Sequence, residues 1–425
     1  MLLRHSIILI GLLLIFPVIT RAQLIETENF EFGLSPDIWY NSVDRLQVGV
    51  MGGMREPGRI QEGPHHVDFG VLLGTRYPDI TLHYRLNYQF NILELAESEV
   101  LSGNIRTYRR DGFQQHGAGI SWSRPADDAR KVWTVNARFY AHELYDDHYQ
   151  LYDHLWSEGW TDMIRLSARL TDWRDFHRNS SISVDARISP GTLDTDGFAR
   201  IEGTGQHRFG FTQSIGLNAR AYAGWVSADA PSPYHLSFAG ASVIDLQDSR
   251  FTRARGTLPP SWSEGGFLHN SGGANLRGFM QREAEHRSAL IQGNIAESQE
   301  LPLAPVTESI VALNSELDFP NPLNKWLRSF PVVGEFIKFS SYLFNDTGVI
   351  FTSEENPLSD AFDSTFWLMN AGAGFELSLN IPDYLGRKRG FQLRFDLPFW
   401  IYDSNINESQ FELRPILGLG SIYNF

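Results

Sequence analysis

The sequence predicts an all-β chain, a closed antiparallel transmembrane β-barrel of about 14 strands, with 12 to 16 possible. Three observations predict this fold. Apolar and polar residues alternate along segments of about 10 to 16 residues, whereas strands of ordinary globular proteins have about five or six. Aromatic residues make up 13% of a chain whose mean hydropathy is only −0.25. The chain also begins with the pattern of an export signal.

The first 22 residues predict a secretory signal peptide. They combine Arg4, an apolar stretch over residues 7–19 and a small-x-small cleavage site. The alternative is a single membrane anchor, which the shortness of the apolar stretch disfavours. Residues 23–36 are then expected to form a short periplasmic N-terminal segment, and residues 37–425 the barrel domain.

The strands are predicted from period-2 alternation. From Leu82 to Phe90, for example, leucine, tyrosine and phenylalanine alternate with histidine, arginine, asparagine and glutamine. Helical periodicity is weak throughout the chain beyond the signal. The predicted strands cover residues 43–54, 66–77, 79–91, 112–124, 131–142, 161–172, 179–190, 198–211, 214–227, 307–319, 336–351, 366–381, 389–401 and 411–425.

Alternation alone also fits a soluble β-sandwich, whose inner face is apolar. The length of the strands, the glycines on their polar face and the export signal favour a membrane barrel, in which the apolar face meets lipid. Longer connections are then expected outside the cell, including 55–65, 92–111, 143–160 and 228–306. Connections 191–197 and 320–335 fit this scheme poorly.

The C-terminus adds a signal of its own. Tyr423 and Phe425 lie on one face of the last alternating segment, and bacterial outer-membrane barrels commonly end in such an aromatic residue. We therefore expect Tyr423 and Phe425 to form a C-terminal assembly signal. The expected location is the bacterial outer membrane. The expected partners are its lipid and the barrel assembly machinery.

Composition and motifs exclude other classes. The chain has no cysteine, and its net charge of −14 disfavours nucleic acid as a partner. No GxSxG, P-loop or CxxC motif occurs. The stretch from His142 to His154 is rich in acids and histidines, but Asp146 stands where a metalloprotease helix needs its second histidine. We expect an acidic loop there, no enzyme activity, and no catalytic, cofactor or metal residues.

Two motifs carry a family resemblance. Asn275-Leu276-Arg277-Gly278-Phe279 is similar to a VRGF/Y signature, with leucine in place of valine, and Phe344-Asn345-Asp346-Thr347-Gly348 matches an FxDxG pattern. Both resemble the BamA/TamA superfamily of outer-membrane barrels, the bacterial surface-antigen type. The chain differs from the family in its count of fourteen strands, where sixteen are usual, and in lacking the periplasmic repeats.

The resemblance implies a loop that folds into the barrel lumen, where Arg277 pairs with Asp346. Gly278 would then allow a tight turn, Phe279 would anchor the loop, and Phe344 and Gly348 would complete the facing strand. The alternative for Arg277 is a plain arginine on a surface loop.

The resemblance implies a role in envelope biogenesis or in translocation across the outer membrane. Two alternatives remain open. One is a general porin or channel. The other is the membrane-anchoring barrel partner of a separate envelope hydrolase, in which case an envelope protein would be a further partner.

Overall fold

The fold comes from a computed structural model. It describes residues 23–26, 30–55, 65–75, 81–96, 99–125, 130–175, 178–212, 215–248, 252–253, 256–280, 306–327, 329, 336–351, 365–382, 388–404 and 408–423. The expected signal peptide, residues 1–22, and the terminal Phe425 lie outside the described residues.

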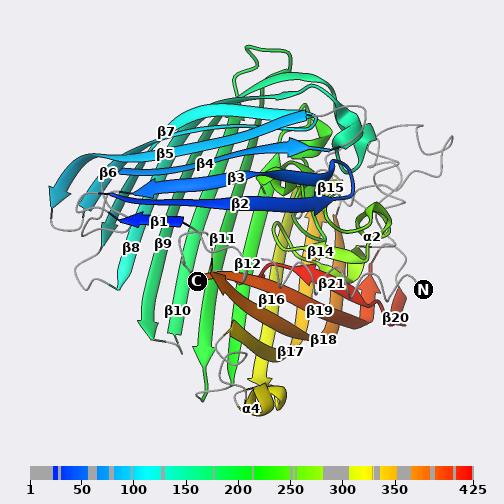
Figure 1. The fold of residues 1–425 in the computed structure, drawn as a ribbon. Helices are drawn as coiled ribbons and strands as arrows, with labels where there is room; N and C mark the ends of the chain where they lie inside the picture. Colours follow the sequence, from blue (N-terminus) through cyan, green and yellow to red (C-terminus); the bar gives the residue numbers. More distant parts are fainter. Residues whose placement is uncertain are drawn as a thin grey trace.

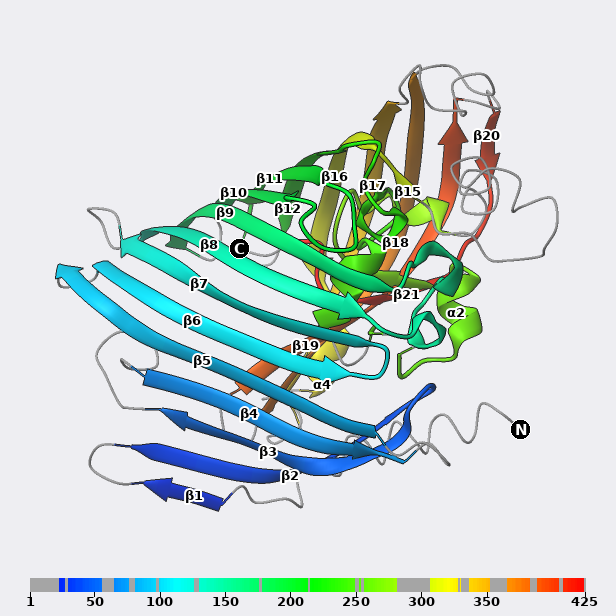
Figure 2. The same cartoon turned by 90° about the horizontal axis from the view of Figure 1, so that it is seen from above.

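One large antiparallel sheet dominates the chain (Figure 1). Its long strands pair in chain order, and β12 pairs directly with β16 across a long insertion. Seen from above, the sheet curves around the insertion (Figure 2). The fifteen long strands are β2 (Glu31–Asn41), β3 (Arg45–Arg55), β4 (His65–Gly74), β5 (Thr81–Ala96), β6 (Glu99–Arg110), β7 (Phe113–Pro125), β8 (Lys131–Leu144), β9 (Gly159–Asp175), β10 (Arg178–Ser189), β11 (Phe198–Gly210), β12 (Gly216–Val226), β16 (Ser309–Pro320), β17 (Ile337–Phe351), β18 (Thr365–Pro382) and β19 (Lys388–Asp403).

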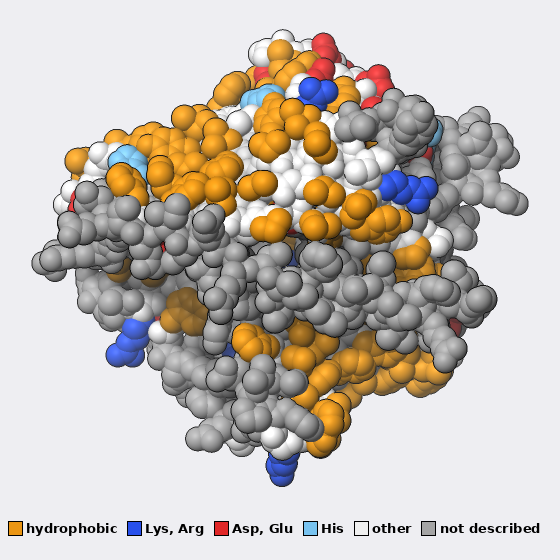
Figure 3. All heavy atoms as spheres, in the orientation of Figure 1, with side chains coloured by type: hydrophobic (Ala, Val, Ile, Leu, Met, Phe, Trp, Pro, Cys, Tyr) orange, Lys and Arg blue, Asp and Glu red, His pale blue; other side chains and the backbone are white. Residues whose placement is uncertain are grey.

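Each long strand has a polar concave face and an apolar convex face, as period-2 alternation requires. On β12, Asn218, Arg220 and Tyr222 are at most 5% exposed, whereas Trp225 is 47% exposed. On the neighbouring β16, Leu313 is 54% exposed. Figure 3 shows hydrophobic side chains gathered over the outer face of the N-terminal strands. The alternation predicted from sequence is therefore present, with its apolar side turned outward.

The sheet does not close, so the predicted closed barrel is wrong. At one edge β1 (Gln23–Glu26) pairs with β2, and at the other β20 (Glu408–Phe411) and β21 (Ile416–Leu419) pair with successive parts of β19. Within the described ranges, no pairing joins the two edges. The physical reason lies at β21, whose outer edge pairs in parallel with β14 (Leu268–Asn270) of the insertion. Backbone groups that closure would need are thus already bonded.

The predicted count of fourteen strands is also wrong, because the described residues hold more. β6 falls inside the expected loop 92–111, and β1 and β2 precede the first expected strand at 43–54. The expected last strand, 411–425, contains the last residue of β20 and all of β21. Because β6 adds a crossing, the β3–β4 connection lies at the opposite end of the sheet from the insertion. The sequence scheme had placed both at one end.

The insertion between β12 and β16 packs inside the curve of the sheet. Its buried Leu236, Phe238 and Leu276 form one apolar cluster with Ile310 on β16 and Ile350 on β17. In the described part of the chain, no helix is long and apolar enough to cross a membrane. The shorter elements are η1 (Asp147–Tyr149), η2 (Asp153–Leu155), η3 (Ser232–Tyr234), β13 (Leu236–Ser237), η4 (Val243–Asp248), α2 (Pro260–Glu264), η5 (Arg277–Phe279), β15 (Val306–Thr307) and α4 (Leu323–Leu327).

Candidate functional site: a buried arginine under the insertion

Arg277 is the centre of the most densely bonded polar cluster beneath the insertion. It opens the single turn η5, and its side chain is fully buried against the concave face of the sheet. Its backbone N–H and its Nε both donate to Asp346 Oδ2, at 3.3 and 2.9 Å, and its Nη2 donates to Asp346 Oδ1 at 2.8 Å. The structure therefore brings together the two residues that the family resemblance implied, in a bidentate ion pair.

Two further carboxylates share the same guanidinium. Arg277 Nη1 donates to Glu316 Oε1 on β16 at 2.6 Å and to Asp396 Oδ1 on β19 at 3.2 Å. Asp396 also accepts a hydrogen bond from the Tyr342 hydroxyl at 2.7 Å, and its other oxygen lies 3.4 Å from Arg394 Nη1. One arginine from the insertion thus ties three separate strands together.

Strand register explains why Asp346 sits at this point. Asn314 on β16 and Asn370 on β18 lie directly opposite Asp346 in the sheet. Both amide groups donate to the Asp346 carboxylate, at 3.1 and 3.0 Å. Asn314 also donates to the backbone oxygens of Ala274 and Asn275 in the insertion, each at 3.1 Å. Asp346 is therefore held by two neutral donors as well as by Arg277.

Close packing completes the contact between insertion and sheet. The Arg277 guanidinium carbon lies 3.8 Å from the centre of the Phe344 ring, a cation–π contact. A Cβ atom on Gly278 would come within 2.8 Å of Asn370 Cβ, and one on Gly348 within 2.6 Å of Leu276 Cδ1. Both glycines thus permit an approach that a larger residue would block.

The remaining expected residues lie as follows. Phe279 is 1% exposed and belongs to the apolar cluster under the insertion. Tyr423 is buried near the C-terminus, while Phe425 lies outside the described residues. Arg414, close to β21 in the chain, donates to the Gly278 carbonyl at 2.5 Å and so links the C-terminal segment to η5.

The electrostatics of the cluster favour a fixed ion pair. Burial opposes the charge of Arg277, but Asp346, Glu316 and Asp396 outweigh that effect and raise its pKa well above the ordinary value. Four of the five guanidinium N–H groups donate to these three carboxylates, so most of the group is committed to the protein rather than directed at a ligand. The arrangement suits a clamp better than a catalytic group.

Alternation in the sequence predicted which residues lie on the polar face of the sheet, but not which of them contact Arg277. Glu316, Asp396 and Asn314 all occupy inward positions, yet only the register of the strands shows that they meet Arg277. The acidic stretch after β8 forms two 3₁₀ turns, η1 and η2, rather than a metalloprotease helix. Near the end of β8, His142 Nε2 lies 2.7 Å from the buried Tyr234 hydroxyl.

Comparisons with known proteins give limited information. No family model matches the chain, and a search of curated proteins found no match. Among solved structures, the chain is similar to BamA from Haemophilus ducreyi lacking POTRA domains 1-3, at 12% identity and a TM-score of 0.48, over 93% of this chain and 74% of that chain. It is also similar to Pseudomonas aeruginosa OprD, at 9% identity and a TM-score of 0.30, over 92% of each chain. Likenesses of this size do not assign a family or a function.

Proposed function

We propose that this chain is a bacterial outer-membrane protein whose long strands cross the lipid, with the insertion clamped on their concave face by Arg277. The observation that carries the proposal is the exposure of the convex face. Phe139, Ile120 and Val184, on three different strands, are 57%, 51% and 47% exposed. A water-soluble sheet would bury side chains of this size and number, whereas lipid solvates them.

Strand length supports the same placement. The long strands have 10 to 18 residues, and each residue advances the chain by about 3.3 Å. Tilted strands of roughly 9–11 residues are enough to cross the apolar core of a bilayer. The described strands therefore meet or exceed the length that membrane crossing requires.

Within the outer membrane, we assign the chain to a BamA/TamA-like, non-enzymatic role in envelope biogenesis or translocation. Its expected partners are outer-membrane lipid and the barrel assembly machinery. The support is the pair formed by Arg277 and Asp346, together with the glycines that let η5 approach β17 and β18. Because the ion pair of Arg277 and Asp346 holds the insertion at one buried point, the whole insertion can stay fixed or be released as a unit.

Membrane placement can be tested by thiol labelling, because the chain has no cysteine of its own. In outer-membrane vesicles, Ile120→Cys should react with a lipid-soluble maleimide and resist a charged, water-soluble one. Ser157→Cys, an exposed position after η2, is the matched control and should react with the charged reagent. Equal labelling of both variants by the charged reagent would show that the convex face is in water.

The role in biogenesis needs a separate measurement. Cells that lack the chain should accumulate less folded outer-membrane protein, measured as heat-modifiable species on gels. The wild-type chain should restore the level, and Arg277→Met should restore it less well. Unchanged levels of every outer-membrane protein in the deletion strain would contradict the biogenesis role while leaving the membrane placement intact.

A second candidate function, an anion-preferring channel, is favoured by one observation. Arg138, Arg165, Arg187 and Arg200 lie directly opposite one another on β8, β9, β10 and β11. Arg187 and Arg200 both pair with Asp245 of the insertion. Arg138 has no carboxylate at ion-pair distance among the described residues. Like charges placed opposite each other are unfavourable unless counter-ions offset them. Arg165 and Arg187 also pair with Asp185, and Arg200 pairs with Glu202, so a mobile anion suits Arg138.

A further inference from the structure

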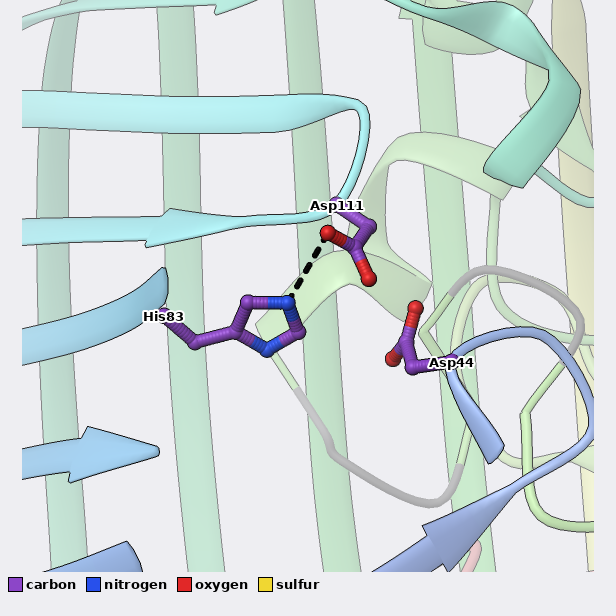
Figure 4. A group of neighbouring side chains, drawn as sticks. All are labelled: Asp44, His83 and Asp111. Atoms are coloured by element: carbon purple, nitrogen blue, oxygen red, sulfur yellow. Dashed lines mark ion pairs between the residues drawn. The ribbon is translucent and has the colours of Figure 1, made fainter. Parts of the chain in front are cut away.

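Three side chains from separate parts of the N-terminal half meet at one end of the sheet (Figure 4). Asp44 lies in the turn between β2 and β3, His83 near the start of β5, and Asp111 in the turn between β6 and β7. Their exposed fractions are 1%, 4% and 5%. One potential ligand atom from each lies within 4.8 Å of the other two. His83 Nε2 is 2.9 Å from Asp111 Oδ1.

One carboxylate oxygen in this cluster lacks a donor. Asp44 Oδ1 is buried, and no hydrogen bond reaches it from the described residues. Asp111 Oδ1 is also buried, and its neighbour is His83 Nε2 at 2.9 Å. Figure 4 shows the two carboxyl groups directed toward each other beside the imidazole of His83. Buried carboxylates normally accept several hydrogen bonds or bind a cation, because an unpaired charge in the interior is costly.

The second oxygen of Asp44 is, by contrast, fully used. Asp44 Oδ2 accepts hydrogen bonds from the Asn41 amide, from Gln47 Nε2 at 2.6 Å and from Arg253 Nη2 at 3.0 Å. Asp44 Oδ1 accepts none of these hydrogen bonds and is directed at Asp111. With both acids ionised, Arg253 neutralises only one of the two negative charges. Burial, reinforced by Asp111, raises the pKa of Asp44 to about 6.

We propose that Asp44, His83 and Asp111 bind one divalent cation of the zinc or manganese class. Two carboxylate oxygens and one imidazole nitrogen suit these borderline ions, and water can fill the remaining positions. The cation would supply the missing positive charge between Asp44 Oδ1 and Asp111. This inference is independent of the proposed function.

The surroundings hold the three ligands in place. Asn41 Oδ1 accepts the backbone N–H groups of Val43 and Asp44, at 2.9 and 2.7 Å, which fixes the β2–β3 turn. Gln47 Nε2 lies 3.1 Å from His83 Nδ1 and so contacts two of the ligands. When His83 binds the ion through Nε2, its proton moves to Nδ1. Gln47 must then turn its amide to accept that proton, which gives up its hydrogen bond to Asp44 Oδ2 as the ion takes over the charge of Asp44. Such supporting contacts orient metal-binding histidines.

The site would act as a staple for the N-terminal strands. Its ligands join the β2–β3 turn, strand β5 and the β6–β7 turn, which are not neighbours in the chain. The insertion reaches the same point, because Arg253 pairs with Asp44 and the Ser42 N–H donates to the Gly256 carbonyl at 2.8 Å. A bound cation would therefore stabilise both the sheet end and the segment that covers it.

The test uses the full-length, untagged chain, stripped with EDTA, dialysed and then titrated with Zn²⁺ and, separately, Mn²⁺. Metal retained after desalting is measured by mass spectrometry, and thermal unfolding is followed in parallel. Wild type should retain one ion per chain and unfold at a higher temperature with the metal. Asp111→Asn and His83→Gln should lose stoichiometric binding, and Gln47→Ala should bind about 10- to 100-fold more weakly.

Asp147→Asn is the matched control. Asp147 belongs to a more exposed acidic group with Asp146 and Glu158, and its substitution should leave binding unchanged. Failure of the wild type to take up either ion would refute the proposal, even if some variants do not fold. Binding that survives in folded Asp111→Asn and His83→Gln would also refute it. Greater stability of Asp111→Asn at neutral pH, without metal uptake by wild type, would instead assign a shared proton to the two carboxyl groups.

Discussion

Replacing Arg277 by methionine removes the guanidinium while keeping an unbranched side chain of similar length. Four hydrogen bonds from the side chain are lost, two to Asp346 and one each to Glu316 and Asp396. The three carboxylates remain in place, and the guanidinium of Arg394, at 3.4 Å from Asp396, is the nearest remaining cation in the network.

The magnitude follows from this imbalance. Removing one partner of a buried ion pair typically costs about 3–5 kcal/mol, because the other charge stays buried without compensation. Here the change leaves three acids with one arginine, so we expect a loss in the upper part of that range. Protonation of one carboxylate would limit the loss. With a urea slope of about 1–3 kcal/mol per M, the unfolding midpoint should fall by roughly 1–5 M.

The assay is urea unfolding of the chain refolded in detergent, followed by tryptophan fluorescence. Arg124→Met is the matched control, because Arg124 is 55% exposed and lies 3.9 Å from Glu99, where a surface pair contributes at most about 1 kcal/mol. Arg277→Met combined with Asp346→Asn should cost less than the sum of the two single changes. A midpoint for Arg277→Met equal to that of Arg124→Met would refute the clamp.

Three further outcomes are expected. Gly348→Ala should destabilise the chain by about 1–3 kcal/mol in the same urea assay, because its methyl group would meet the fully buried Leu276. Gly203→Ala, whose methyl group would face open space, should change stability little. Equal effects of the two variants would contradict the packing argument. Burial lowers the pKa of His269 well below its usual value, as does the nearby guanidinium of Arg394. The unfolded chain therefore binds a proton that the folded chain does not bind. The free energy of unfolding should fall by up to about 1.4 kcal/mol per pH unit as the pH drops below about 6.5. His269→Asn should flatten that decline, and an unchanged pH dependence would exclude this histidine as its source. Arg138→Gln should reduce the preference for anions in planar bilayers if the channel function holds, and identical reversal potentials for variant and wild type would count against it.

The sequence predicted the all-β character and most of the long strands, because alternation follows directly from which face meets which solvent. β6 was missed for a physical reason. Its convex face carries only Leu101 and Ile105 as large apolar residues, so the period-2 pattern is weak there. Closure could not be judged from sequence, since the three-residue pairing of β14 with β21 has no pattern that distinguishes it from a loop.

The residues of the candidate sites were likewise only partly predictable from the sequence. Arg277 and Asp346 could be named because their motifs resemble a known family and Asp346 alternates inward. Glu316 and Asp396 could not be assigned to Arg277, because contacts across strands depend on register rather than on local composition. The same limit hid the meeting of Asp44, His83 and Asp111, which lie far apart in the chain and show no motif spacing.

The parallel pairing of β14 with β21 has a consequence for the order of folding. Leu268 and Leu417 face each other across about 150 residues of chain, so this contact carries a large loop-closure entropy and should form late. Until then β21 presents an unbonded edge, the kind of surface on which chains aggregate. Refolding should therefore show a slow final phase, and the chain should be most prone to association just before that phase ends.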